Sequence, residues 1–216
     1  AEEAAKTAED YEDFDTLGAA NELLPALQVS GAFYDAENAL KAKNYDEAIA
    51  GYNKVLSLKP DHANAAFRIV QANVDAGNMD AAKAAVEKAA SLGKEADAKK
   101  LIGKAYLKKA NAALKAKSYP EALSNAQQAS EFIQEGNVYL IAGQAASNIP
   151  GKETTAIENF DKYLAISPNA KNAGAITCNV GGIYQKLKNN DKAREYYNKA
   201  VALGFAPAAE YLKALK

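Results

Sequence analysis

The stretch that decides the fold reads NYDEAIAGYNKVLSLKP, residues Asn44–Pro60. Its apolar positions Ala48, Tyr52 and Val55 are spaced by four and then three residues, which places them on one face of a helix. Pro60 marks the end of that helix, because proline cannot continue one. The same spacing returns in four further sets: Ala82, Val86, Ala89; Ala122, Ala126, Ala129; Ala156, Phe160, Tyr163; and Ala193, Tyr197, Ala200.

The alanines that begin these sets lie 34, 40, 34 and 37 residues apart, so the chain is built from repeats. A second helical pattern precedes each set, and its residue twelve or thirteen positions upstream is small in four of the five repeats. Small residues there let two helix axes approach closely. Residues typical of turns separate the patterns near positions 44, 77, 118, 150 and 189. The sequence therefore predicts antiparallel helix pairs, at least ten helices and no sheet. The upstream residues are Ala36, Val70, Ala110, Gly143 and Gly181.

Asn44–Pro60 and NNDKAREYYNKAVALG, residues Asn189–Gly204, resemble the second half of a tetratricopeptide repeat. The resemblance covers roughly residues 30–204 in five units. Three features depart from the family pattern: no tryptophan is present in any first helix, Ala126 replaces the usual aromatic residue, and ten residues are inserted around Gly93–Ile102. The resemblance implies an all-α fold, a right-handed superhelical α-solenoid of about five antiparallel helix pairs.

The predicted solenoid occupies residues 29–204, between an acidic N-terminal helical segment, 1–28, and a C-terminal capping helix, 205–216. The N-terminal segment has a net charge of −7, and the remainder has +6. Tyr11, Phe14, Leu23 and Leu24 predict that part of the segment packs on the first unit, with slow amide exchange at Leu23–Leu27 and fast exchange at Glu2–Asp10. The expected units are 29–62, 63–93, 94–135, 136–170 and 171–204.

Composition excludes several classes of function. The net charge of −1 favours neither nucleic acid nor a membrane surface as partner. No run of 18 apolar residues is present that could insert into a membrane, and the single cysteine, Cys178, excludes an internal disulfide. Because the first residue is alanine, we favour an exported, periplasmic chain after signal-peptide removal over a cytoplasmic one.

Residues suited to catalysis or metal binding are sparse. His62 is the sole histidine and is expected in an exposed loop, while Cys178 falls on the first helix of the fifth unit. Asp13, Asp15 and Gly18 match part of a calcium loop, but Leu17 and Leu24 stand where oxygen ligands are needed. Gly143 to Gly151-Lys152 has the wrong spacing for a phosphate loop. The sequence predicts no enzymatic activity, no metal and no cofactor.

In the tetratricopeptide-repeat family the first helices line a concave groove, and some relatives clamp a peptide carboxylate there with Lys, Arg and Asn. Glu37, in the first unit, departs from that pattern. Mapping by repeat position also gives Phe33, Leu40, Leu140, Gln144, Cys178 and Gln185. The candidate ligand-binding residues are Asn64, Phe67, Arg68, Gln71, Lys104, Leu107, Lys108 and Asn111.

A row of lysines marks the first helix of the third unit. Lys100, Lys104 and Lys108 are four residues apart and form one stripe, where like charges repel. Two interpretations stay open: a solvated helix face, or a patch for an acidic ligand.

The leading interpretation of function is a non-catalytic protein–protein interaction scaffold, or adaptor, that binds a peptide or protein segment in its concave groove. An acidic or carboxylate-ended peptide with one apolar anchor is the favoured partner. The alternatives are a structural module that self-associates, and a cell-envelope subunit that binds glycan or outer-membrane components. The sequence leaves the oligomeric state open.

Overall fold

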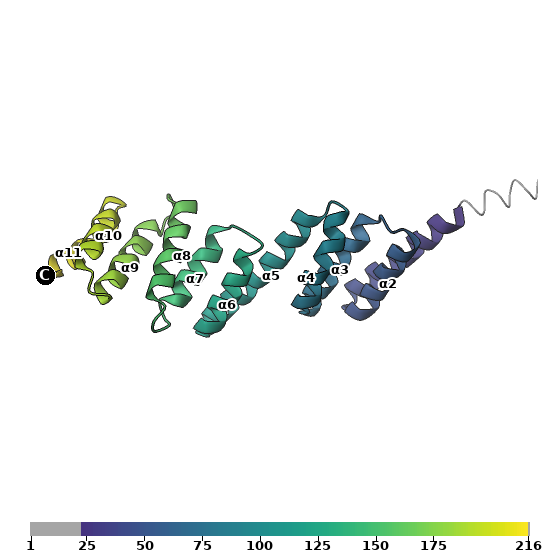
Figure 1. Ribbon diagram of the computed structural model, residues 1–216, viewed down its shortest axis with the longest axis horizontal. Coiled ribbons are helices and arrows are strands. Elements are labelled where there is room, and N and C mark those ends of the chain that lie inside the picture. The colour runs from purple at the N-terminus through teal and green to yellow at the C-terminus, as the bar shows by residue number, and fades with distance from the viewer. Residues whose placement is uncertain (1–22, 216) are drawn as a thin grey trace, which may run out of the picture. The chain divides into compact units, whose positions relative to one another are not determined.

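The computed structural model describes residues 23–215, which are helices joined by turns, with no strand among them (Figure 1). This confirms the predicted all-α fold and α-solenoid class. Helix covers residues 23–41 and then α2 (Tyr45–Leu58), α3 (Ala63–Ala76), α4 (Met79–Ser91), α5 (Glu95–Lys115), α6 (Tyr119–Ser130), α7 (Gly136–Ala146), α8 (Glu153–Ile166), α9 (Ala173–Lys186), α10 (Asn190–Ala202) and α11 (Ala208–Ala214).

The described chain divides into two compact units, residues 23–101 and 102–215, which are treated separately below. In unit 1 the helix over residues 23–41 turns back into α2, α2 packs on α3, and α3 packs on α4. The predicted face of α2 is its core face, because Ala48, Tyr52 and Val55 are all fully buried. They pack with Ala36 and Ala65 from the neighbouring helices. One helix face thus fixes the unit's core.

In unit 2 consecutive helices also pack on one another, as Figure 1 shows for α6 to α11. Its main core joins the C-terminal half of α5 to α6, α7, α8 and α9. Ala110 and Ala126 are fully buried in this core, so alanine at the position usually occupied by an aromatic residue still faces inward. The packing is sequential, which is the property that defines a solenoid.

Two glycines set the closest helix approaches in unit 2. A Cβ atom at Gly143 would lie 2.5 Å from the Phe160 ring of α8, and one at Gly181 would lie 2.6 Å from the Tyr197 ring of α10. Both rings are buried almost completely. These contacts explain why small residues recur upstream of each repeat's apolar set.

The turn inside each helix pair contains one residue with positive φ, always five residues before the first alanine of the apolar set. Glycine fills the position in two turns and lysine in three. In four of the turns the next residue's N–H bonds the carbonyl five positions back, closing the helix end in a Schellman motif. Regular turn geometry therefore underlies the predicted repeat. The positive-φ residues are Lys43, Gly77, Lys117, Gly151 and Lys188.

The inserted residues around Gly93–Ile102 lengthen a helix instead of a loop. Helix α5 has 21 residues, whereas α2 and α3 have 14 each. At the other end of unit 2, α11 packs on α10 as the predicted capping helix. Ala208 and Leu215 are buried against Cys178 and Tyr197, so α11 covers apolar surface that the last pair leaves open.

The prediction that Leu23 and Leu24 pack on the first helix pair is wrong. Leu23 is 60% exposed and Leu24 is 54% exposed. The helix from residue 23 to 41 has five more residues than its 14-residue partner α2, so its first turn extends beyond the end of α2. The predictions made for residues 1–22, including Tyr11, Phe14 and the calcium-loop match, lie outside the described residues.

Candidate functional site

Helix α3 of unit 1 carries half of the predicted ligand-binding residues. Asn64 is exposed, and Phe67, Arg68 and Gln71 are half-buried. They share a face of α3 because they are spaced by three and four residues. The structure thus places these four side chains along one helix, as the repeat mapping expects.

Arg68, however, is already paired with a carboxylate. Its Nε lies 2.8 Å from Glu37 Oε1, and its Nη2 lies 3.2 Å from Glu37 Oε2. Arg68 also donates a hydrogen bond to Gln71 Oε1 at 2.5 Å. The sequence predicted that the positive charge of Arg68 binds a ligand. In the structure this charge is balanced inside unit 1 by Glu37, the residue that departs from the family pattern.

Tyr52 completes this cluster. Its hydroxyl donates to Glu37 Oε1 at 2.6 Å. Burial, and then the hydrogen bond to the Glu37 carboxylate, raise the pKa of Tyr52 well above its usual value. The hydroxyl therefore stays protonated at neutral pH and acts as a fixed donor that holds Glu37 toward Arg68.

The other half of the predicted residues lines a surface hollow in unit 2 of about 520 Å³. We call it the basic hollow. Leu107, Leu140 and Ile141 contribute apolar surface, and Lys104 and Lys108 are the charged side chains that the described residues place there. Gln144, which the repeat mapping also assigned to the groove, is part of the lining. The complete lining is Lys104, Leu107, Lys108, Asn111, Leu114, Asn137, Leu140, Ile141 and Gln144.

The polar side chains of the basic hollow are available to a ligand. Lys104, Lys108, Asn111 and Asn137 form no side-chain hydrogen bond or ion pair with any residue of the described range 23–215. All four are exposed. The two ammonium groups can donate hydrogen bonds to a carboxylate, and the two amides can bond an extended backbone. The apolar surface of the hollow can hold an apolar side chain.

Asn137 and Ile141 were not among the residues predicted from sequence. On α7, Asn137 lies three residues before Leu140 and Ile141 lies three residues before Gln144, and Leu140 and Gln144 were both assigned by the repeat mapping. The same helical spacing that selected those two could have identified them.

His62 is not simply an exposed loop residue. It is the N-cap of α3, where its Nδ1 accepts a hydrogen bond from the Ala65 N–H at 3.1 Å. Its ring stacks on Phe33 with 5.1 Å between centroids. These contacts assign His62 a role in helix capping and packing.

Cys178, the single cysteine, is 5% exposed on α9. Burial raises the pKa of its thiol, so the thiolate form needed by a nucleophile is disfavoured at neutral pH. Within residues 23–215 no cluster of three or more His, Cys, Asp or Glu residues is arranged to hold a metal. None of the helices that the structure describes combines the length and apolar character needed to cross a membrane.

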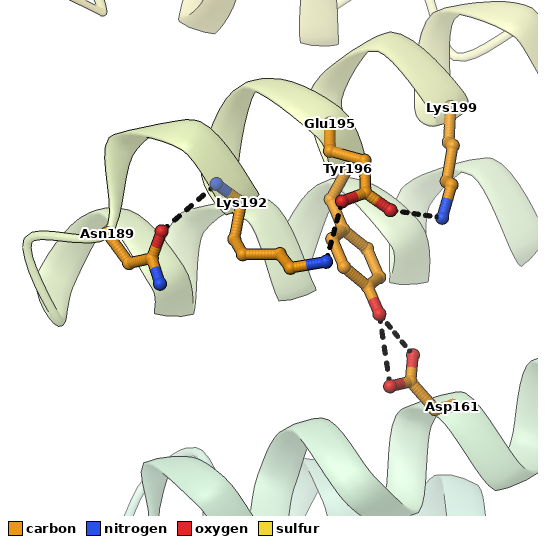
Figure 2. A network of polar contacts seen from close by, with 6 residues as sticks. All are labelled: Asp161, Asn189, Lys192, Glu195, Tyr196 and Lys199. Carbon is orange, nitrogen blue, oxygen red and sulfur yellow. Dashed lines mark hydrogen bonds and ion pairs between the residues drawn. The ribbon is translucent and has the colours of Figure 1, made fainter.

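A separate polar network links α8 and α10 (Figure 2). Tyr196 donates to both oxygens of Asp161, at 3.0 and 3.1 Å. On α10, Glu195 lies 2.8 Å from Lys192 and 2.7 Å from Lys199. Burial, and then the Asp161 carboxylate, raise the pKa of Tyr196. The network fastens the last two helix pairs of unit 2 to each other.

Glu195 should make stability depend on acid pH. Hydrogen bonds from Lys192 and then Lys199 lower its pKa from 4.5 to about 2. A depressed folded-state pKa means that this contribution is present above pH 4.5 and is lost as the pH falls toward 2. We expect Glu195→Gln to lower the melting temperature slightly at neutral pH, and the difference to vanish near pH 2.

Glu158→Gln is the matched control, because Glu158 is an exposed carboxylate on α8 that forms no ion pair with a described residue. The melting temperature of the Glu158→Gln variant should equal that of the unsubstituted protein at every pH. A Glu195→Gln difference that persists unchanged at pH 2 would contradict the assignment.

Comparison with known protein families finds repeats in two segments of the chain. The tetratricopeptide-repeat family model matches residues 39–105, and a second tetratricopeptide-repeat model matches residues 176–203. The chain contains tetratricopeptide repeats. The matched segments include α2 to α4 and most of the last helix pair, α9 and α10.

No curated protein sequence matches this tetratricopeptide-repeat chain. Among solved structures it is similar to the MamA protein, with 20% identity, a TM-score of 0.43 and coverage of 82% of this chain and 91% of that one. It is similar to YrrB, described as a TPR protein with an unusual peptide-binding site, at 23% identity, a TM-score of 0.41 and 85% and 91% coverage. It is also similar to the TPR domain of P58(IPK), with 16% identity and a TM-score of 0.48. That match covers 92% of this chain and 63% of the other.

Proposed function

We propose that this tetratricopeptide-repeat protein is a non-catalytic interaction scaffold that binds an acidic segment of a partner protein in the basic hollow. The observation that carries the proposal is the pair of exposed, unpaired lysines, Lys104 and Lys108, above the apolar surface of Leu107 and Leu140. A carboxylate bound there would neutralise two like charges that now repel each other along α5.

The amides favour an extended polypeptide as the ligand. Asn111, Asn137 and Gln144 can each donate and accept a hydrogen bond, which matches the alternating N–H and C=O groups of a peptide backbone. A catalytic role has no comparable support, since the one cysteine is buried with a raised pKa and the one histidine caps a helix.

The proposed site differs from the full sequence-derived set. In unit 1, Arg68 pairs with Glu37 and Gln71 accepts a hydrogen bond from Arg68, so we assign ligand binding to the four residues of α5 and to their neighbours on α7. Asn64 and Phe67 of unit 1 are not part of this proposed site.

Reversing the two charges of the basic hollow should weaken partner binding by about tenfold to a hundredfold, because charge-assisted hydrogen bonds are lost and replaced by repulsion. The partner is first captured with the full chain from lysate, and its bound segment is mapped and synthesised. Affinity for that peptide is then measured by calorimetry with the Lys104→Glu, Lys108→Glu variant at two salt concentrations. The variant should also lose most of the salt dependence.

The matched control is Lys109→Glu with Lys115→Glu. Both lysines are exposed on α5 and neither lines the basic hollow, so the change in net charge is identical. The control should bind within about twofold of the unsubstituted protein, because surface charges act weakly at a distance in salt. An equal loss of affinity in both variants would show that the effect comes from the overall charge of the protein, and would contradict the proposal.

Self-assembly is a second candidate function, favoured by one observation in unit 1. Leu23, Leu27 and Tyr34 are 60%, 65% and 66% exposed. Their spacing of four and seven residues places them on one face of the helix over residues 23–41. Sedimentation velocity over a range of concentrations separates the two functions, since a scaffold acting as a monomer shows a constant sedimentation coefficient.

A further inference from the structure

A second hollow lies in unit 2, at its C-terminal end, with a volume of about 600 Å³. We call it the tyrosine hollow. Tyr197 of α10 and Tyr211 of α11 line it, together with Phe205 from the connection between those helices. The described residues around it contribute no carboxylate and one cation, Lys186. Its chemistry therefore differs from that of the basic hollow: the surface is aromatic and nearly uncharged.

The two tyrosines are held in fixed positions. The Tyr197 hydroxyl donates to Gln185 Oε1 at 2.8 Å, and the Tyr197 side chain is almost completely buried. The Tyr211 ring stacks on it with 5.5 Å between centroids and 20° between planes. Tyr211 is nevertheless 50% exposed, so one part of its ring packs on Tyr197 and another part faces solvent. The structure thus presents a pre-positioned aromatic surface.

Small residues on α9 create the space beside these rings. Cys178 and Gly182 are four residues apart, so they lie on one face of α9, and both line the tyrosine hollow. A Cβ atom at Gly182 would meet only the Tyr197 hydroxyl, at 3.7 Å. By contrast, the neighbouring Gly181 is pressed against the Tyr197 ring. Gly182 is therefore not required for helix packing, and its missing side chain leaves the hollow open.

Helix α7 connects the tyrosine hollow to the basic hollow. Gln144 of α7 lines the basic hollow, and Ser147 and Asn148, in the turn that follows α7, line the tyrosine hollow. The Asn148 side chain donates to the Gln144 carbonyl at 2.8 Å, so the two hollows lie close together. An extended peptide covers about 3.3 Å per residue, so one short segment can reach both hollows.

We propose that the tyrosine hollow holds an aromatic side chain of the same peptide segment whose acidic residue binds Lys104 and Lys108. This inference rests on the function proposed above. The exposed part of the Tyr211 ring favours a flat ligand group, since aromatic pairs gain from offset or edge-to-face contact beyond their buried area. The Asn148 amide nitrogen donates to the Gln144 carbonyl at 2.8 Å, so its side-chain oxygen and the amide of Asn179 are the groups that can bond the backbone on either side of that residue.

Selection from a library of random short peptides tests the inference without knowledge of the natural partner. The unsubstituted protein should enrich peptides that contain both an acidic and an aromatic residue. Gly182→Leu fills the tyrosine hollow with a side chain that favours helix, and should keep the acidic preference but lose the aromatic one. The Lys104→Glu, Lys108→Glu variant should do the reverse.

Affinities of one enriched peptide then quantify the effect. Gly182→Leu and, independently, Tyr211→Ala should each weaken binding about tenfold, and replacing the peptide's aromatic residue by alanine should cost the unsubstituted protein a similar factor. Peptides enriched for acidic residues alone would overturn this inference and leave the basic hollow intact as a site. Enrichment of aromatic residues alone would overturn the proposed function instead, and enrichment of neither would overturn both.

Discussion

Alanine at position 143 should lower the free energy of unfolding by about 1–3 kcal/mol, the usual cost of overpacking a dense core. Its Cβ would lie 2.5 and 2.6 Å from two carbons of the Phe160 ring, closer than atoms can pack. Phe160 is 1% exposed, so its ring has no free space to move into. The helix propensity that alanine gains over glycine, about 1 kcal/mol, offsets only part of this cost.

Gly182→Ala is the control, on a helix of the same unit. Its Cβ would meet only the Tyr197 hydroxyl at 3.7 Å, an ordinary contact, so the propensity gain should leave stability unchanged or raised by up to about 1 kcal/mol. Urea denaturation followed by circular dichroism measures both. Adding Phe160→Leu to Gly143→Ala should cost less than the two single changes together, because the clash is removed. Equal stability of the two alanine variants would show that α7 and α8 do not approach as closely as described.

Gly143 also illustrates how much of the fold the sequence predicts. Its position thirteen residues before Ala156, and that of Gly181 twelve before Ala193, identified them as sites where helices meet. The structure places each against the aromatic ring four residues beyond that alanine. Local spacing suffices here because each repeat packs mainly on its sequence neighbours, so helical periodicity carries almost all of the information about packing.

The basic hollow was predictable for the same reason. Lys104, Leu107, Lys108 and Asn111 share one face of one helix, and that spacing alone brings them together. The pairing of Arg68 was not predictable in this way. Its partner Glu37 lies 31 residues away on another helix, and periodicity cannot tell whether two side chains on neighbouring helices point to each other or to a ligand.

The tyrosine hollow was missed because it depends on an absent side chain and on α11. Cys178 and Gln185 were placed in the groove by repeat position, but the sequence pattern does not distinguish Gly182, which leaves space, from Gly181, which lets helices touch. Tyr211 belongs to a capping helix outside the repeat, so no repeat position could assign it to a ligand-binding surface.

Replacing Glu37 by alanine should lower the free energy of unfolding by about 1–3 kcal/mol, the cost of leaving polar groups without their partners. The Glu37 carboxylate accepts from the buried Tyr52 hydroxyl and faces Arg68 with both oxygens. The side chains of Arg68 and Glu37 are only 33% and 20% exposed, so water replaces these contacts incompletely. Denaturant unfolding of the full chain, followed by circular dichroism, measures the loss.

Tyr52→Phe is the conservative control, since it removes one hydrogen bond and leaves the ion pair. It should cost about 1 kcal/mol. Arg68→Ala combined with Glu37→Ala should cost less than the sum of the single changes, because the second change removes a charge that the first has left unpaired. Additive costs would show that the two side chains do not interact between the helix over residues 23–41 and α3.

A second substitution, Glu37→Gln, tests what Arg68 does when the charge of its partner is removed. With Glu37 removed, the guanidinium regains an unbalanced charge on the face of α3 that carries Asn64, Phe67 and Gln71. If that face belongs to the ligand-binding surface predicted from sequence, Glu37→Gln should raise affinity for an acidic peptide by about threefold to tenfold, a gain that Arg68→Gln abolishes. Unchanged affinity in both variants would confine recognition to unit 2, and would make the ion pair of Glu37 and Arg68 purely a part of the unit 1 core.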